Sequence, residues 1–212
     1  MVWYEPKEEV VMSNIYLIHG IASETKYPLE KTVVLEQVFQ LPVKQLSYNS
    51  AASYQDNVQM LQGQVDDSPL FFVGTSLGAF YASKLAEIFH KDAAMPIMLN
   101  PCHDPYSTLN KIKGMCVNFA SGEEVELTCQ VIDSYQGVPI IDCSMILPRW
   151  IMLNMDDEVL NANETLALYN NSLEVITFEC GGHRFENIGS SEVIAQLDRI
   201  NNSYFIHSVA DA

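Results

Sequence analysis

A serine flanked by two glycines lies where an apolar run gives way to a helical pattern. The segment Gly74-Thr75-Ser76-Leu77-Gly78 has the spacing G-x-S-x-G. A serine on such a strand-to-helix turn is strained and lifted above the sheet, and the glycines let strand and helix pass closely. The helix after it favours negative charge at its amino end. We interpret Ser76 as a nucleophile for acyl transfer; the alternative is a tight turn with a structural serine.

A histidine follows two glycines directly after the last expected strand. In Cys180-Gly181-Gly182-His183 the glycines let the loop fold back, so that the imidazole reaches the serine. We therefore predict His183 as the general base. His103 is the main alternative because it also follows an expected strand, whereas His90 at a helix end and His207 in the tail are placed less well.

Three carboxylates, Asp156, Asp157 and Glu158, follow the preceding strand. The acid of a triad holds the histidine tautomer and stabilises the imidazolium. Asp157 is preferred because Asp-x-Val-Leu then leads into a helix, and Asp156 is the alternative. We expect Asp157→Asn to reduce ester turnover strongly and Asp156→Asn mildly. The chain order Ser76, Asp157, His183 is that of an α/β-hydrolase, unlike the orders of chymotrypsin and subtilisin.

The first expected strand ends in Leu17-Ile18-His19-Gly20-Ile21. Acyl transfer needs N–H donors aimed at the tetrahedral oxyanion. In this fold one donor belongs to the residue after the nucleophile and one to the loop after an early strand. We predict the backbone N–H groups of Leu77 and Ile21 as these donors. His19 is expected to be a structural support rather than a base.

Apolar segments of strand length alternate with segments of helical period. This alternation predicts an α/β protein with a mostly parallel sheet of about six strands and helices on both faces. Strands are expected at Val10–Ile18, Val43–Tyr48, Leu70–Gly74, Met95–Asn100, Trp150–Asn154 and Leu173–Glu179. Helices are expected at Pro28–Gln40, Ser53–Val65, Leu77–His90, Asn163–Asn171 and Ser190–Asn201.

We interpret residues 1–212 as one domain with an insertion. Pro101–Pro148 shows no clear strand and only short helix-like pieces such as Ser107–Lys113. So long a segment is unusual for a plain loop, and we expect residues 102–148 to be a lid. Apolar side chains there are expected either to roof an acyl pocket or to complete the core: Met115, Phe119, Ile140, Met145 and Ile146.

Residues 1–11 have no periodic face of their own, and the buried strand is expected to begin near Asn14. We interpret them as an N-terminal extension whose Trp3 and Tyr4 rest against the domain or a neighbouring subunit. The start of the chain lacks the basic and apolar regions of a secretory signal, so a cytoplasmic location is expected.

Composition narrows the range of partners. The net charge of −16 repels nucleic-acid phosphates and anionic lipids, and no apolar run is long enough for a membrane-spanning helix. Five cysteines without a C-x-x-C pair favour reduced, buried structural thiols over disulfides. The expected partner is a small-molecule ester or thioester, and the oligomeric state stays open.

From Met12 to about Ile200 the chain resembles the small bacterial esterases of the YqiA/YcfP type, uncharacterised protein family 0227 of the α/β-hydrolase superfamily. The resemblance is carried by MSNIYLIHG, VGTSLGAFYASKLAE, LNP at 99–101, MDDEVLNANETLALY and ECGGHRF. It implies the triad Ser76, Asp157 and His183, the donors Ile21 and Leu77, and a short-acyl esterase-like activity without a cofactor. It also implies that the fold's two usual leading strands are absent and that Met12 is a possible alternative start. Residues 102–148 resemble the family only weakly, which leaves the substrate preference open. The alternative functions are an acyltransferase that uses the same triad and a catalytically silent binding protein of this fold.

Overall fold

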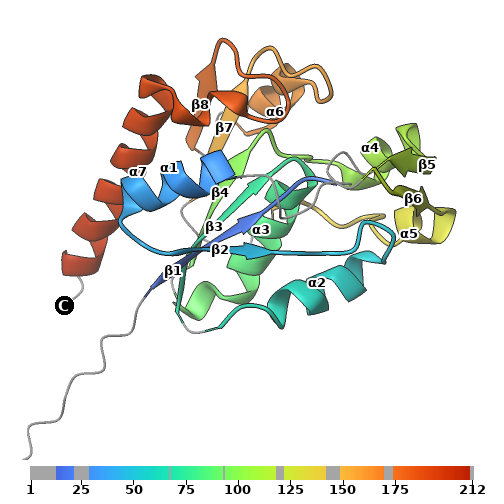
Figure 1. The fold of residues 1–212 in the computed structure, drawn as a ribbon, viewed down its shortest axis with the longest axis horizontal. Helices are drawn as coiled ribbons and strands as arrows, with labels where there is room; N and C mark the ends of the chain where they lie inside the picture. The colour runs from blue at the N-terminus through green and yellow to red at the C-terminus, as the bar shows by residue number, and fades with distance from the viewer. Residues whose placement is uncertain are drawn as a thin grey trace, which may run out of the picture.

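Six parallel strands form the central sheet of the protein. The computed structural model describes residues 13–21, 29–66, 68–92, 94–117, 122–141, 149–169 and 174–210. The strand order is β2-β1-β3-β4-β7-β8, and each neighbouring pair is parallel (Figure 1). The strands are β1 Asn14–Ile18, β2 Val43–Leu46, β3 Pro69–Thr75, β4 Met95–Leu99, β7 Trp150–Asn154 and β8 Glu174–Phe178. All six overlap the predicted segments, which confirms the expected sheet.

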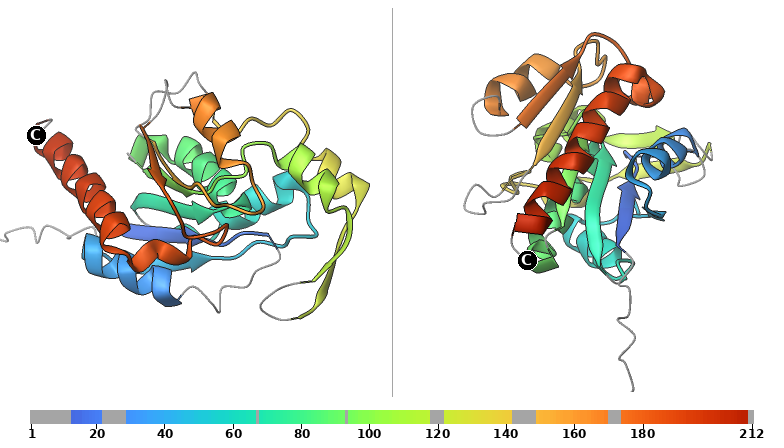
Figure 2. Two further views of the ribbon diagram at one scale, coloured as in Figure 1. Left: turned by 90° about the horizontal axis from the view of Figure 1, so that it is seen from above. Right: turned by 90° about the vertical axis from the view of Figure 1, so that its left-hand side faces the viewer.

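Helices cover both faces of this sheet, as predicted. On one face α1 Leu29–Phe39 and α7 Ser191–Ala210 lie side by side (Figures 1 and 2). The other face is covered by α2 Tyr54–Gln62, α3 Leu77–Ile88 and α6 Ala162–Tyr169. Two short 3₁₀ turns, η1 His90–Asp92 and η2 Glu186–Gly189, complete this part of the fold.

The last helix is longer than the sequence predicts. We expected α7 to end at Asn201, but it continues to Ala210. Asparagine is a weak helix former and does not by itself stop a helix. The side chain of Asn201 instead donates a 3.2 Å hydrogen bond to the Val38 carbonyl of α1, and this bond ties the two helices together.

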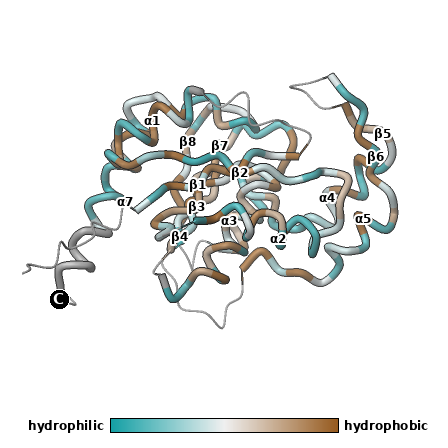
Figure 3. The backbone as a smooth tube through the Cα atoms, turned by 60° about the horizontal axis from the view of Figure 1, so that its bottom comes forward, coloured by the Kyte–Doolittle hydropathy of each residue, from teal (hydrophilic) through white to brown (hydrophobic). Residues whose placement is uncertain are grey.

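Each strand sends alternate side chains to the two faces. On β1, Ile15 and Leu17 pack with α1 and α7, whereas Tyr16 and Ile18 pack with α2 and α3. Figure 3 shows hydrophobic stretches along the central strands. Burial on both faces explains why the strands read as nearly continuous apolar runs rather than as alternating patterns.

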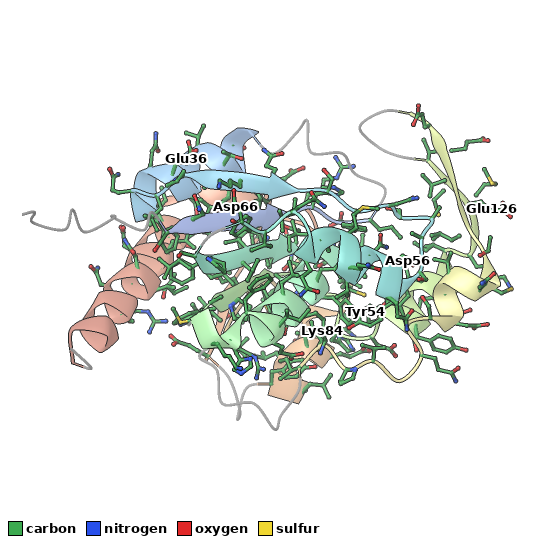
Figure 4. The ribbon with its side chains drawn as sticks, turned by 90° about the horizontal axis from the view of Figure 1, so that it is seen from below. Glu36, Tyr54, Asp56, Asp66, Lys84 and Glu126 are labelled. Carbon is green, nitrogen blue, oxygen red and sulfur yellow. The ribbon has the colours of Figure 1, made fainter. Side chains whose placement is uncertain are left out.

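Two buried cations lie at the amino edge of the sheet. Lys84 of α3, labelled in Figure 4, is 2.7 Å from Glu87, and Arg149 is 3.4 Å from the same carboxylate. Arg149 directly precedes β7, so this cluster is on the opposite side of the sheet from the loops that follow the strands. Paired in this way, the charges stabilise the packing of α3 against the start of β7.

The loops after the strands emerge at the other edge. The chain passes from β1 to β2 on one side and then to β3 on the other, so the strand order reverses between β1 and β3. Open parallel sheets bind ligands outside the carboxyl ends of the strands at such a point. Ser76 directly follows β3, and Gly20 follows β1.

The segment between β4 and β7 differs from the prediction. We expected no strand there, but β5 Gly114–Val117 and β6 Glu124–Leu127 pair as an antiparallel hairpin. It is flanked by α4 Pro105–Lys111 and α5 Cys129–Asp133, and it lies at the end of the molecule away from α7 (Figures 1 and 2).

The hairpin was missed because its sequence lacks a buried face of the usual kind. Each strand has only four residues. Met115 pairs with Glu126, which Figure 4 labels on the hairpin, and Val117 pairs with Glu124. Met115 is 59% exposed. Apolar and acidic side chains therefore share one exposed face.

The apolar residues expected to complete the core or to roof a pocket are only partly within the described chain. Ile140 belongs to the core on the α3 face of the sheet. The remaining residues expected to pack or to roof a pocket lie outside the described part of the chain, namely Trp3, Tyr4, Phe119, Met145 and Ile146.

The first turn of α3 packs directly on backbone at the end of β1. A Cβ atom on Gly78 would lie 2.8 Å from the carbonyl carbon of His19 and still closer to the carbonyl oxygens of Ile18 and His19. A Cβ atom on Gly74 would lie 2.6 Å from the Ala79 nitrogen. Both glycines of the G-x-S-x-G segment are therefore required by packing.

This packing predicts that Gly78→Ala destabilises the fold. A methyl group without room costs about 3 kcal/mol in a packed interior, which corresponds to roughly 6 to 12 °C in the thermal midpoint of a chain of this size. Gly63→Ala is the matched control, because Gly63 has φ −69° and its Cβ would lie 3.5 Å from the Gln59 carbonyl oxygen. That variant should be as stable as the wild type or slightly more so. Equal midpoints for the two variants, measured by calorimetry, would contradict the prediction.

Candidate active site

Ser76 occupies the turn between β3 and α3 in a conformation that serine rarely adopts. Its φ of 57° and ψ of −122° are those of the first central residue of a type II′ turn, where glycine is usual. Such strain costs about 1–3 kcal/mol. The Ser76 N–H donates to the Leu99 carbonyl at 3.0 Å, and the Cys102 N–H donates to the Ser76 carbonyl at 3.1 Å. The end of β4 and the segment that follows it therefore hold the N–H and the carbonyl of the strained residue.

The loop after β1 lies against the serine side chain. A Cβ atom on Gly20 would be 3.4 Å from Ser76 Cβ and 3.9 Å from its Oγ. Ile21 is the next residue, and Leu77 begins α3, where a backbone N–H has no acceptor within the helix. The two predicted oxyanion donors thus belong to segments on either side of Ser76, and their role stays a prediction.

His19 supports that loop. Its ring stacks on Tyr48, with centroids 5.1 Å apart and an interplanar angle of 14°. Its Nδ1 lies 2.8 Å from the Gly20 carbonyl oxygen. Burial raises the pKa of Tyr48 well above its usual value, so this phenol stays neutral beneath the imidazole.

His183 and Asp157 meet at the ends of β8 and β7. His183 Nδ1 is 2.9 Å from Asp157 Oδ2 and 3.0 Å from Oδ1. Asp157 Oδ1 also accepts the N–H groups of Val159 and Leu160, both at 2.8 Å, and the carboxylate is only 2% exposed. The backbone therefore orients this acid toward the imidazole. Because Nδ1 is occupied, Nε2 is the nitrogen that is left to serve Ser76.

The structure brings the loop of His183 to the neighbourhood of the serine. Asn100 follows Leu99, the residue that accepts from Ser76, and donates through Nδ2 to the His183 carbonyl at 3.0 Å. Within the described residues the Ser76 hydroxyl forms no hydrogen bond with His183. Contacts between nucleophile and base are commonly long in a free enzyme and tighten with substrate. The direct contact between the two side chains stays a prediction.

The two carboxylates beside Asp157 have tasks that the sequence did not reveal. Asp156 accepts the N–H groups of Gly182 at 2.9 Å and Gly181 at 3.2 Å. Glu158 accepts the N–H of His183 at 2.9 Å. The sequence features that could have indicated these contacts are the run of three acids after one strand and the glycine pair after the next strand. All three acids therefore hold the histidine loop, each at a different point.

The other candidate bases have other partners. His103 Nδ1 lies 3.2 Å from the Thr165 hydroxyl of α6, and His90 Nδ1 lies 2.9 Å from the Glu87 carbonyl oxygen at the end of α3. The side chain of His207 lies outside the described residues.

Lys31 of α1 holds the residue after His183. Its Nζ donates to the Arg184 carbonyl at 2.6 Å, and burial lowers its pKa from 10.5 to about 8. The folded state disfavours the charged form, so this group adds stability as the pH rises from about 8 toward 10.5.

Among the residues that the structure describes, no group of three or more His, Cys, Asp or Glu side chains is arranged to hold a metal ion. Nor does any described helix have the length and apolar character needed to cross a membrane.

Comparison with known proteins agrees with this architecture. The model of a family described as "Uncharacterised protein family (UPF0227)" matches residues 14–198. The structure is similar to Est1E from Butyrivibrio proteoclasticus, with TM-score 0.66, 12% identity, and coverage of 94% of this chain and 89% of that one. It is also similar to mouse alpha/beta hydrolase domain-containing protein 10, with TM-score 0.63, 15% identity and coverage of 92% and 90%. A third similar structure is the esterase domain of a Rhodothermus marinus protein, with TM-score 0.63, 14% identity, and coverage of 93% of this chain and 88% of that one. At these identities the likeness shows the fold, and the expected α/β-hydrolase fold is confirmed.

The expectation of buried cysteines is only partly correct. Cys102 is buried, but Cys129 and Cys180 are exposed, because one begins a short surface helix and the other lies in the histidine loop. Cys116 is half-buried, and Cys143 lies outside the described residues. The four described cysteines are free thiols.

We predict that Cys102 resists alkylation in the folded protein. Burial raises the pKa of its thiol to about 11, so at pH 8 only about one molecule in a thousand carries the reactive thiolate. Iodoacetamide at pH 8, followed by peptide mass spectrometry, should modify Cys129 and Cys180 and spare Cys102. Unfolded protein provides the control, in which all three are modified. Rapid modification of Cys102 in the native state would contradict the prediction.

Proposed function

The chain belongs to uncharacterised protein family UPF0227, and from this premise we propose that it is a serine hydrolase that cleaves a carboxylic ester or thioester. The observation that carries the proposal is the hydrogen-bonded pair of His183 and Asp157 at the sheet edge where Ser76 occupies its strained turn. A nucleophile, a base and an orienting acid are the groups that acyl transfer through a covalent intermediate requires.

In the proposed reaction the Ser76 hydroxyl attacks the substrate carbonyl carbon while His183 Nε2 takes the hydroxyl proton. Asp157 keeps the other proton on Nδ1 and stabilises the imidazolium. The imidazolium then gives its Nε2 proton to the departing alcohol or thiol, and the acyl group remains on Ser76. Water attacks the acyl-enzyme by the same route, with His183 again taking a proton, and releases the acid.

The oxyanion of each tetrahedral intermediate is proposed to bind the N–H groups of Ile21 and Leu77. Leu77 lies at the amino end of α3, where the helix dipole favours negative charge. Gly20 lies close to the Ser76 side chain, and this supports the next residue of the β1 loop, Ile21, as the second donor. Such fixed donors act where charge develops and need no rearrangement during the reaction.

We propose that residues 102–148 border the acyl site as a lid of a single domain, 1–212, with residues 1–11 as an extension. Cys102 bonds to the Ser76 carbonyl, and Ser134 accepts a 2.8 Å hydrogen bond from the Tyr54 N–H of α2. The hydroxyls of Tyr135 and Tyr81 also bond, which ties the segment to α3. The free thiols in the described residues suit a cytoplasmic enzyme.

A fluorophosphonate probe tests the nucleophile directly. We expect it to label the wild type covalently on Ser76. The Ser76→Ala variant should not be labelled, and its ester turnover should fall by several orders of magnitude. Ser83→Ala is the matched control, since Ser83 is a buried serine within α3 whose hydroxyl has no partner among the described residues. It should keep both signals. A panel of esters and thioesters of varied acyl length measures the turnover.

The outcomes separate the possible functions. Labelling of Ser76 without hydrolysis of any ester would favour an acyltransferase. Absence of labelling in folded wild-type protein would contradict the proposal and favour a silent binding protein.

The two neighbouring aspartates test the identity of the acid. Asp157→Asn should lower kcat about 10³- to 10⁴-fold, because an amide presents an N–H to Nδ1 and favours the wrong tautomer. Asp156→Asn keeps one acceptor for the glycine N–H groups and loses the other, so we expect a loss of about tenfold rather than the mild effect expected from sequence. Steady-state kinetics with a common ester compares the variants. If Asp156→Asn proved the more damaging, the acid would be Asp156.

A further inference from the structure

Three asparagines hold the loop that carries His183. Asn100 follows β4, Asn154 ends β7, and Asn187 lies in η2, so they come from three separate parts of the chain. Asn154 is fully buried and Asn100 is 2% exposed. Buried carboxamides are costly unless their donors and acceptors are paired. Their hydrogen bonds therefore show what they hold in place.

Asn154 and Asn187 form a reciprocal amide pair. Asn187 Nδ2 donates to Asn154 Oδ1 at 2.8 Å, and Asn154 Nδ2 donates to Asn187 Oδ1 at 3.1 Å. The second N–H of each side-chain amide donates to the histidine loop. Asn154 Nδ2 donates to the Gly182 carbonyl at 3.0 Å, and Asn187 Nδ2 donates to the Cys180 carbonyl at 2.8 Å. This pair anchors the start of the loop to β7.

Of the three asparagines, Asn100 is the one that bonds to His183 itself. Its Nδ2 donates to the Gly182 carbonyl at 2.9 Å and to the His183 carbonyl at 3.0 Å, and its Oδ1 accepts the Asn154 N–H at 2.8 Å. Its backbone φ is 43°, a left-handed value that asparagine tolerates better than most residues. One side chain thus joins the ends of β4 and β7 to the residue that carries the imidazole.

The same short segment also holds the nucleophile. Leu99 accepts the Ser76 N–H, and Cys102 donates to the Ser76 carbonyl. Between these two contacts Asn100 bonds to His183. The segment 99–102 is therefore a direct backbone connection between the strained serine turn and the histidine loop. The Asp157 carboxylate contacts the imidazole itself, through Nδ1, and not the backbone that Asn100 holds.

We propose that Asn100 is a positioning residue that sets the place of the His183 imidazole relative to Ser76. The proposal rests on the proposed function, since it gives the two residues their roles. A misplacement of about 1 Å between reacting groups can cost about a hundredfold in rate. Loss of the Asn100 amide removes the side-chain bond to the His183 carbonyl and one of the bonds to the Gly182 carbonyl, which Asn154 still holds. It should therefore reduce turnover more than it reduces substrate binding.

Asn100→Gly tests the proposal, because glycine accepts the left-handed φ and removes only the amide. We expect kcat and the rate of fluorophosphonate labelling to fall about 30- to 100-fold, with KM within about twofold of wild type. The downfield Nδ1–H proton resonance of His183 in NMR spectra should weaken or broaden, since the ring is no longer held. Wild-type kcat, labelling rate and resonance in a folded Asn100→Gly protein would overturn the proposal.

Asn57→Ala is the matched control for a structural effect. Asn57 of α2 is also fully buried, and its amide bonds to the Asn49 carbonyl at 2.9 Å and to the Tyr81 hydroxyl at 3.1 Å, away from the histidine loop. It should lower the thermal midpoint and leave kcat and the His183 resonance unchanged. An equal loss of kcat in both variants would show a general packing effect and overturn the proposal.

Two further arms keep the test decisive. If Asn100→Gly does not fold, Asn100→Asp keeps the shape and the acceptor but places a carboxylate against two carbonyls, and it should show the same loss of kcat. Wild-type kcat in that variant would overturn the proposal. If the wild type neither labels nor hydrolyses esters, the proposed function fails by itself. The His183 resonance then decides the present inference: its loss in the variant supports the positioning role, and its retention overturns it.

Discussion

The close approach of the first turn of α3 to the end of β1 is the constraint on which the site depends. The carbonyl groups of Ile18 and His19 lie where a side chain of Gly78 would be. Because the helix comes so close, the chain turns sharply at Ser76 and the residue takes a glycine-like conformation. The same approach brings Gly20 against the serine side chain. One contact between backbones therefore places both the candidate nucleophile and the loop of the expected oxyanion donor.

Backbone strain is present at this edge, and the core offsets it. Of the five non-glycine residues with positive φ in the described part of the chain, Ser76, Asn100 and Phe185 lie in segments that follow strands, and the other two lie before strands. Such a conformation costs a non-glycine residue about 1–3 kcal/mol, comparable with the stabilisation from burying one large apolar side chain. Phe185 shows this balance within one residue, because its ring is fully buried and packs edge-on against Phe178. A sheet buried on both faces supplies many such contacts away from the site.

The sequence allowed the sheet and the pairing of His183 with Asp157 to be predicted, because both depend on local patterns. Buried parallel strands are long apolar runs, and the residues at their ends can be read directly. The hairpin was missed because Met115 and Val117 lie opposite acids on an exposed face. The contacts of Asp156 were missed for another reason: they join residues far apart in the chain, and only the fold shows that its partners are the N–H groups of Gly181 and Gly182.

The polar groups of the histidine loop are divided between two kinds of partner by charge. Its N–H groups bond to the carboxylates of Asp156 and Glu158, while the carbonyls of Gly182 and His183 bond to the carboxamide of Asn100. A carboxylate accepts but cannot donate, so the two kinds cannot be exchanged without placing like partial charges together. The run of three acids is therefore not redundant. Two of them bond to backbone N–H groups, and Asp157 is the one that bonds to the imidazole. The neutral carboxamides hold the carbonyls of the loop without adding a further negative charge beside the imidazole.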